Sequence, residues 1–219
     1  MIELSPLEQE ILDALKQRRP DLDPCIDDLL ALHETLVTLY DNNGTLFSCG
    51  NGGSHADSIH IAGELAKSFE RVRTVSDEVK KKLEGLPWGD ELAENLETGL
   101  AAIPLGVSGA LKTAVENDSP LRDIAFAQEL FALAKPGDVI LGISTSGNAP
   151  NCIMAHSTGK AVGCTAVSLT GPHGGLLATH ADIAIRTPGA STALVQEGHI
   201  ALWHTMCLLI EAHYFPQKR

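Results

Sequence analysis

The chain has 219 residues, enough for one large domain with a substantial hydrophobic core. Its contents of 44% hydrophobic and 20% charged residues are ordinary for a soluble globular protein. With 16 basic and 28 acidic residues the formal net charge is -12, which argues against a broad nucleic-acid-binding surface. A small anion can still be bound by backbone amides and hydroxyl groups, because net charge governs long-range fields rather than single pockets.

The cysteines and the two ends of the chain predict a cytoplasmic protein. The five cysteines are scattered and form no CxxC pair, which is typical of reduced thiols: Cys25, Cys49, Cys152, Cys164 and Cys207. The opening MIELSPLEQEIL lacks the basic and apolar regions of a signal peptide. The apolar run near the end is interrupted by His204, Glu211 and His213, so we expect no membrane span.

The first elements along the chain are two amphipathic helices, expected over residues 7–18 and 26–40. Pro20 and Pro24 punctuate the link between them, and residues 1–42 together form an expected N-terminal helical arm. The residues Asn42, Asn43 and Gly44 end the second helix and lead into a short strand over residues 45–49.

Four further apolar runs, each followed by a turn and a helix-like segment, cover residues 101–107, 139–143, 165–169 and 183–186. A long last helix follows, over about residues 191–214. Near-continuous hydrophobic strands that alternate with helices predict a parallel sheet covered on both faces. The expected fold class is therefore α/β, a doubly wound five-stranded parallel sheet flanked by helices, in one domain over residues 1–219.

Residues 70–98 interrupt this alternation. The segment is dense in charge and has a Leu-Pro-Trp-Gly break at residues 86–89. It is interpreted either as an inserted helical hairpin or lid, or as a solvated surface excursion.

Glycine and hydroxyl residues gather where two of the expected strands end. After the first strand, Gly50, Gly52 and Gly53 permit positive φ angles and close backbone approach, and Ser54 lies at a helix N-terminus, a natural anion site. The pattern is neither GxGxxG nor a P-loop, because no lysine follows the glycines. The second corner, Ser144–Asn148, precedes Ala149 and Pro150. Either corner alone is equally well a tight structural turn, but two at strand C-terminal ends favour phosphate binding.

Two helices carry proton-handling side chains. His60 and Glu64 are four residues apart and share a helix face, where they bind a divalent metal, pass a proton, or form a simple surface pair. The last helix contains Gln196, Glu197, His199 and His204 among apolar residues. His204 is interpreted either as a satisfied core histidine or as part of a site.

Four motifs together resemble a known family. FSCGNGGSHADSIHIAGE, LGISTSGN, SLTGPHGG and VQEGHIALWH, in this order, are similar to the sugar isomerase (SIS) domain of phosphoheptose isomerases. GNGGS and STSGN alone mark the wider SIS superfamily. The likeness covers nearly the whole chain apart from residues 70–98 and implies a flavodoxin-like SIS domain.

The resemblance implies a homotetramer with active sites between subunits, which interconverts sedoheptulose 7-phosphate and D-glycero-D-manno-heptose 7-phosphate through an enediol. It also implies one zinc ion per subunit, held by His60, Glu64, Gln196 and His204, with His199 not a counterpart. Glu64 corresponds to the base and His204 to the acid. Such a reaction needs a base, a proton donor and an electrophile, which a Glu, a His and a zinc ion provide.

The resemblance also assigns substrate binding to Asn51, Gly52, Gly53, Ser54, Asp118, Ser144, Thr145, Ser146, Asn148 and Gln196. The hydroxyl residues of this set correspond to phosphate contacts, and Asn51 and Asp118 to residues that line the sugar. The chain departs from the family at Ala149, where a polar residue is usual, and after Glu64, where Lys67 stands near a usual basic position.

Two other functions remain open. One is a non-catalytic SIS protein, either a sugar-phosphate sensor or an assembly factor associated with replication initiation. The other is a different SIS enzyme, such as an etherase or an aminosugar isomerase. The presence of all four zinc-type residues favours the phosphosugar isomerase.

Overall fold

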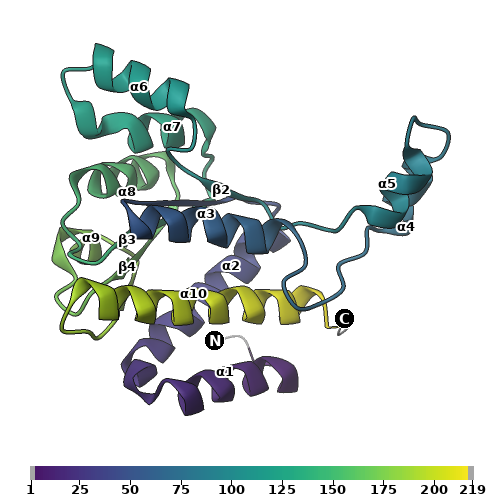
Figure 1. The fold of residues 1–219 in the computed structure, drawn as a ribbon, viewed down its shortest axis with the longest axis horizontal. Helices are drawn as coiled ribbons and strands as arrows, with labels where there is room; N and C mark the ends of the chain where they lie inside the picture. Colours follow the sequence, from purple (N-terminus) through teal and green to yellow (C-terminus); the bar gives the residue numbers. More distant parts are fainter. Residues whose placement is uncertain (1–2, 217–219) are drawn as a thin grey trace.

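A computed structural model describes residues 3–216, and its centre is a five-stranded, wholly parallel sheet of order β2-β1-β3-β4-β5 (Figure 1). The strands are β1 (Leu46–Gly50), β2 (Ala102–Pro104), β3 (Val139–Ser144), β4 (Thr165–Thr170) and β5 (Ile183–Arg186). This order is the flavodoxin-like one, so the predicted fold class is confirmed.

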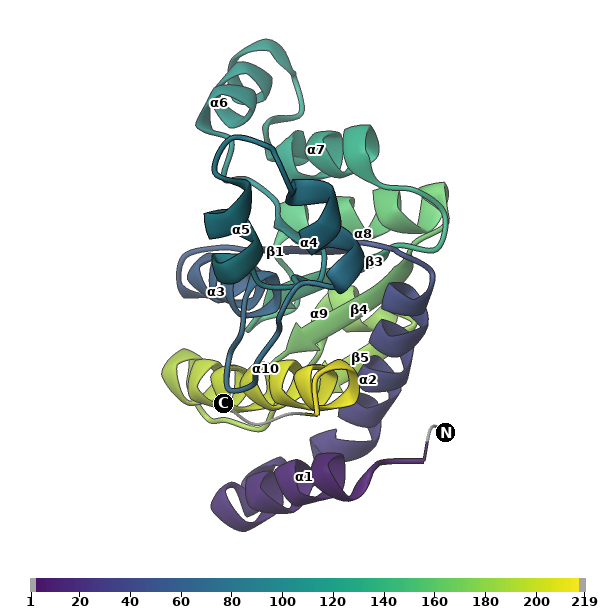
Figure 2. The same ribbon diagram turned by 90° about the vertical axis from the view of Figure 1, so that its right-hand side faces the viewer.

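Helices cover both faces of the sheet (Figures 1 and 2). One face carries α2 (Ile26–Asp41), α3 (Gly53–Ala66) and α10 (Thr192–Tyr214), with α1 (Pro6–Arg18) outside α10 and the 3-10 turn η1 (Pro20–Cys25) between α1 and α2. The other carries α7 (Ala125–Leu133), α8 (Pro150–Val162) and α9 (Gly175–Thr179), with α6 (Gly109–Asp118) and η2 (Arg122–Ile124) beyond them.

The two cores follow from the alternation of side chains along each strand. In β3, Val139, Leu141 and Ile143 pack toward the α2–α3–α10 face, whereas Ile140 packs toward α7 and α8. Both faces are thus buried, which is why residues 139–143 of β3 form a continuous run without a polar side chain.

The N-terminal arm begins with a capping box. Ser5 accepts a hydrogen bond from the backbone N–H of Glu8, and the Glu8 carboxylate accepts one from the backbone N–H of Ser5. Leu12 and Leu15 of α1 join the same core as α10, so the arm is packed onto the domain.

Residues 77–95 form α4 (Asp77–Leu83) and α5 (Gly89–Asn95), which pack against each other and project away from the sheet (Figure 1). An antiparallel bridge between Thr74 and Glu97 closes the base of this hairpin. Trp88, which starts α5 in a left-handed conformation, is 74% exposed.

A buried ion pair fixes the hairpin to the domain. The guanidinium of Arg73 donates to the Glu211 carboxylate of α10 at 2.8 Å, and both side chains are fully buried. Glu211 also accepts the backbone N–H groups of Phe69 and Glu70, while Arg73 donates to the backbone carbonyls of Glu64 and Leu65. The end of α3, the hairpin base and α10 are therefore joined at one point.

The shortest strand differs from its predicted extent. The run 101–107 pairs only over Ala102–Pro104, because Pro104 lacks an N–H donor and Gly106 turns the chain at a φ of +87°. Within residues 3–216, no helix combines the length and apolar composition needed to cross a bilayer. The five cysteines are buried and unpaired, as their scatter predicts.

Candidate active site at the meeting of two corners and two helices

The two glycine- and serine-rich corners lie beside each other, because β1 and β3 are neighbouring strands that end at the same edge. This is the point where the sheet order reverses, the usual place for a ligand in such folds. Reciprocal amide hydrogen bonds join Asn51 of the first corner to Asn151 at the start of α8, at 2.9 and 2.8 Å. The corners therefore form one continuous polar rim.

Neither helix that starts at this rim has a side-chain cap. The N-cap of α3 is Gly52, at a φ of +57°, and that of α8 is Ala149. The first N–H groups of a helix without a cap can bind an anion, and the positive end of the helix dipole favours it.

The hydroxyl groups of the corners differ in accessibility. Ser54 and Ser144 are buried, Thr145 is half-buried and Ser146 is exposed. Asn148 serves the turn itself, since its side chain donates to the Ser146 carbonyl and accepts the N–H of Leu176. The Ser146 hydroxyl is thus exposed to a ligand, whereas the Asn148 side chain stabilises the turn.

The proton-handling side chains meet where α3 and α10 pack side by side (Figure 1). Nε2 of His60 lies 2.9 Å from Oε1 of Glu64. The His60 and His204 rings are edge to face, with centroids 5.4 Å apart. Spacing on α3 and α10 thus brings three of the four predicted zinc ligands side by side, although their ligand atoms do not all lie within 4.8 Å of one another.

Gln196, the fourth predicted ligand, lies toward the start of both helices. Its side-chain Nε2 is 2.7 Å from the point where a Cβ on Gly53 would be, so Gly53 is needed for Gln196 to lie there. Gln196 precedes His204 by eight residues, or about 12 Å along a helix. Within a single chain it therefore faces the first corner rather than His60.

Electrostatics at this site fit a cation. Oε2 of Glu64 is buried and has no hydrogen-bond partner, and its nearest counter-charge is Nζ of Lys67 at 3.9 Å. Burial and the neighbouring His60 lower the pKa of His204, partly opposed by Glu64. A neutral imidazole beside an unpaired carboxylate oxygen is the ligand chemistry of a divalent metal.

Three residues not assigned from sequence also form the site. Trp203 and Phe69 enclose the His204 ring, with centroid distances of 3.9 and 5.5 Å. Asp57, one helical turn before His60, is a buried carboxyl whose pKa is raised by burial. The helical spacing of Asp57 and His60 is the only sequence signal that could have identified any of them.

Asp118 is placed elsewhere. It ends α6, and its carboxylate accepts a hydrogen bond from the adjacent Asn117 side chain. Within residues 3–216, no hydrogen bond or ion pair connects it to either corner. Its contact with a sugar stays a prediction.

Comparison with known proteins decides the family. Phosphoheptose isomerases from Trichlorobacter lovleyi and Geotalea daltonii are 37% and 34% identical to this chain, over 84% and 96% of it and 81% and 94% of their own lengths. This chain belongs to the phosphoheptose isomerase family.

Solved structures agree with this assignment. The phosphoheptose isomerase from Neisseria gonorrhoeae matches with a TM-score of 0.71 and 28% identity, over 93% of this chain and 96% of that one. The enzyme from Francisella tularensis matches with a TM-score of 0.72 and 25% identity, over 92% and 95%. No family model matches the chain. The family predicted from the motifs is confirmed, and with it the prediction of an isomerase.

Proposed function

We propose that this protein converts sedoheptulose 7-phosphate to D-glycero-D-manno-heptose 7-phosphate. The observation that carries the proposal is the meeting of His60, Glu64 and His204 on α3 and α10, directly beyond the uncapped start of α3. A carboxylate, an imidazole and an anion site on one pair of helices are the parts that an aldose–ketose isomerase of phosphosugars requires.

The proton transfers would use the side chains of Glu64 and His204. The Glu64 carboxylate would take the proton from C1 of the ketose while His204 gives a proton to O2, which yields the C1–C2 enediol. Glu64 would then return its proton to C2 while His204 takes the proton from O1, which yields the aldehyde at C1. His204, neutral because of its lowered pKa, offers one ring N–H to the substrate oxygens. Trp203 and Phe69 restrict water around that ring.

His60, Glu64 and His204 would hold a zinc ion, with Gln196 as a further ligand. When bound, the ion supplies an electrophile that stabilises negative charge on the substrate oxygens. The unpartnered Oε2 of Glu64 supports this assignment.

The phosphate group would bind at the rim between the two corners. The positive ends of the α3 and α8 dipoles, together with the hydroxyl groups of Ser54, Ser144, Thr145 and Ser146, would bind it without formal positive charge. Asn51, Gly52, Gly53 and Asn148 shape this rim. The amide link from Asn51 to Asn151 would hold both corners at a fixed spacing.

A cytoplasmic homotetramer is the proposed assembly. Ile59 and Ile200, beside the site on α3 and α10, are 45% and 40% exposed, and a second copy would bury them. The distance of Gln196 from the other three ligands also favours a site that a neighbouring subunit completes.

The test is an assay of aldose–ketose exchange with five-, six- and seven-carbon sugar phosphates. We expect turnover of sedoheptulose 7-phosphate to exceed that of the shorter sugars, and exchange of a C1 proton with solvent deuterium. Binding of the seven-carbon sugar without turnover, in zinc-loaded protein, would contradict the proposal and favour a sugar-phosphate sensor.

A further inference from the structure

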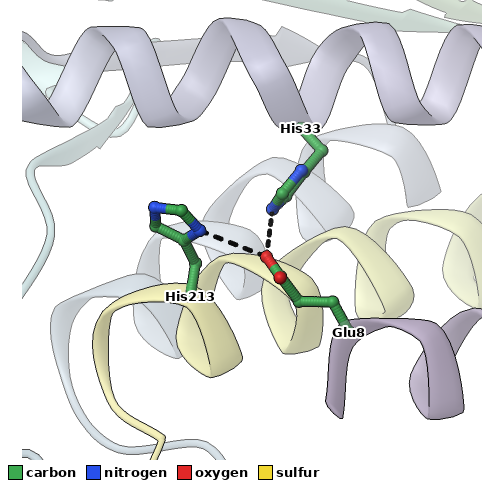
Figure 3. A group of neighbouring side chains, drawn as sticks. All are labelled: Glu8, His33 and His213. Atoms are coloured by element: carbon green, nitrogen blue, oxygen red, sulfur yellow. Dashed lines mark hydrogen bonds and ion pairs between the residues drawn. The ribbon is translucent and has the colours of Figure 1, made fainter. Parts of the chain in front are cut away.

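A second cluster of histidine and carboxylate side chains lies apart from the isomerase site, where α1, α2 and α10 converge (Figure 3). It consists of Glu8 of α1, His33 of α2 and His213 near the end of α10. Oε1 of Glu8 is 3.1 Å from Nε2 of His33 and 3.2 Å from Nδ1 of His213. Within residues 3–216 it is the one group of three His, Cys, Asp or Glu residues whose ligand atoms all lie within 4.8 Å of one another.

Hydrogen bonding alone does not account for the arrangement. Nε2 of His33 is close to the carboxylate but is not aligned to hydrogen-bond with it, and it has no other partner. The His33 side chain is 1% exposed and that of Glu8 is 2% exposed, so water does not compensate either group. A buried polar nitrogen without a partner is costly, and a cation on its lone pair would remove that cost.

The spacing matches the chemistry of zinc. Zinc–nitrogen and zinc–oxygen bonds of about 2.0 to 2.1 Å place the ligand atoms of a tetrahedral site about 3.3 Å apart. The two measured separations from Oε1 of Glu8, 3.1 and 3.2 Å, are within about 0.2 Å of that edge. The donor set of two imidazoles and one carboxylate is one that zinc and other late first-row divalent metals accept.

The protonation states also suit a cation. Burial raises the pKa of Glu8, but hydrogen bonds from Ser5 and the neighbouring histidines outweigh it, so the pKa lies below its ordinary value and the carboxylate is charged. Burial lowers the pKa of His33, more than the nearby Glu8 raises it, which keeps the ring in its neutral ligand form. Oε2 of Glu8 is held by the backbone N–H of Ser5 at 2.7 Å, which orients the carboxylate.

The cluster has a route to solvent. A surface groove of about 750 Å³ is lined by Ser5, Glu8 and His213, among other residues of the two chain ends. His213 is 29% exposed, whereas the other two side chains are buried. A metal ion would enter along this groove, and a water molecule in the groove would provide the fourth ligand.

We propose that Glu8, His33 and His213 bind a divalent cation of the zinc class, which fastens the N-terminal arm to α2 and α10. The site is structural and separate from the isomerase site, because His213 lies near the end of α10, far from Gln196, and the other two ligands come from α1 and α2, which carry none of the isomerase residues. It predicts two zinc-binding sites per chain rather than one.

The experiment counts zinc in chelator-stripped full-length protein by titration against a chromophoric chelator. His60→Ala disables the proposed isomerase site, so one zinc per chain should remain in that variant. Adding His213→Ala should weaken the remaining site by more than about 100-fold, since losing a direct ligand costs more than losing an outer-shell partner. The matched control, His60→Ala with His180→Ala, changes an exposed histidine outside both clusters and should keep its zinc.

Thermal unfolding provides the second readout. At one hundred times the dissociation constant, zinc should raise the Tm of the His60→Ala variant by about 5–10 °C, and should leave the His60→Ala/His213→Ala variant unchanged. Cobalt bound to the His60→Ala variant should give the visible absorption of a tetrahedral ion.

Either of two results overturns the proposal. One is a His60→Ala variant that binds no zinc. The other is equal zinc binding with and without His213. In both cases the three residues would be a hydrogen-bonded contact between helices, whatever the outcome for the isomerase site.

Discussion

The two histidine–carboxylate clusters of this molecule have the same residue types but opposite surroundings. His60, Glu64 and His204 lie where α3 and α10 face solvent, and the His60 side chain is 52% exposed. Glu8 and His33, in contrast, are almost fully buried between three helices. In the first cluster, His60 is exposed and Glu64 is 14% exposed, whereas in the second only His213 reaches the surface.

We therefore propose a catalytic role for the first cluster and a structural role for the second. An open cluster with an unpaired carboxylate oxygen leaves room for a substrate, and its incomplete ligand set invites a neighbouring subunit. The second cluster, with its ligand atoms within 4.8 Å of one another and two of its three side chains buried, is suited to holding an ion. The same change in each cluster should therefore affect different properties, and four variants test that expectation.

Glu64→Gln should have the largest effect. It keeps the size of the side chain but removes the proton acceptor, so kcat should fall by about 10²–10⁴-fold while the Tm stays close to wild type. Turnover is followed by NMR of the heptose phosphates, with exposed Glu70→Gln as the control. Activity above a tenth of wild type would show that another group takes the proton.

His156→Gln tests how a buried histidine outside both clusters affects the stability of the fold as the pH changes. Burial lowers the pKa of His156 to about 4, below its ordinary value near 6.5. The unfolded chain then binds a proton more readily than the folded one, so stability falls as pH drops from about 6.5 to about 4. The loss is on the order of 2 to 3 kcal/mol.

The measurement for this variant is urea unfolding at several pH values between 4 and 8. The wild-type curve should be steeper in this window than the His156→Gln curve, and the two should run parallel above pH 7. Identical slopes would mean that His156 binds protons equally in the folded and unfolded states, so that burial does not lower its pKa. His199, whose pKa is also lowered to about 4 by burial, would keep part of the slope in both proteins.

Glu8→Gln should lower the free energy of unfolding by about 1–3 kcal/mol, because it replaces the buried carboxylate that is hydrogen-bonded to Ser5 and His213 with a neutral amide. Turnover should stay within about twofold of wild type. Chemical denaturation and the isomerase assay on the same preparation give both numbers. A large loss of activity with unchanged stability would reverse the roles assigned to the two clusters.

Gly53→Ala should have the smallest effect. Its new methyl group meets only the flexible end of the Gln196 side chain, at 2.7 Å, so the fold is kept and Gln196 moves. If Gln196 supports the metal or substrate, kcat/KM should fall by roughly tenfold. An unchanged kcat/KM would show that Gln196 supports neither the metal nor the substrate.

The sequence predicts the sheet and the open cluster well, for physical reasons. Apolar runs such as residues 139–143, short and bounded by turn residues, favour strands buried on both faces, and glycine with serine after a strand favours a corner. His60 and Glu64 are one helical turn apart, so their proximity is local and visible in the sequence.

The closed cluster is not predictable in this way. Glu8, His33 and His213 come from three helices, and only the tertiary packing of α1 against α2 and α10 brings them together. The Arg73–Glu211 pair has the same origin. Long-range pairs of charged residues leave no periodic signal, since each partner alone resembles an ordinary surface residue.

The attachment of the hairpin at Glu211 has a mechanical consequence. Arg73 donates to the backbone carbonyl of Glu64 on α3 and to the Glu211 carboxylate on α10, so the base of the hairpin is tied to both helices. A rotation of α10 would pass through Arg73 to the base of the hairpin, at whose tip the indole of Trp88 is exposed. The fluorescence of Trp88 would then report movement of α3 and α10.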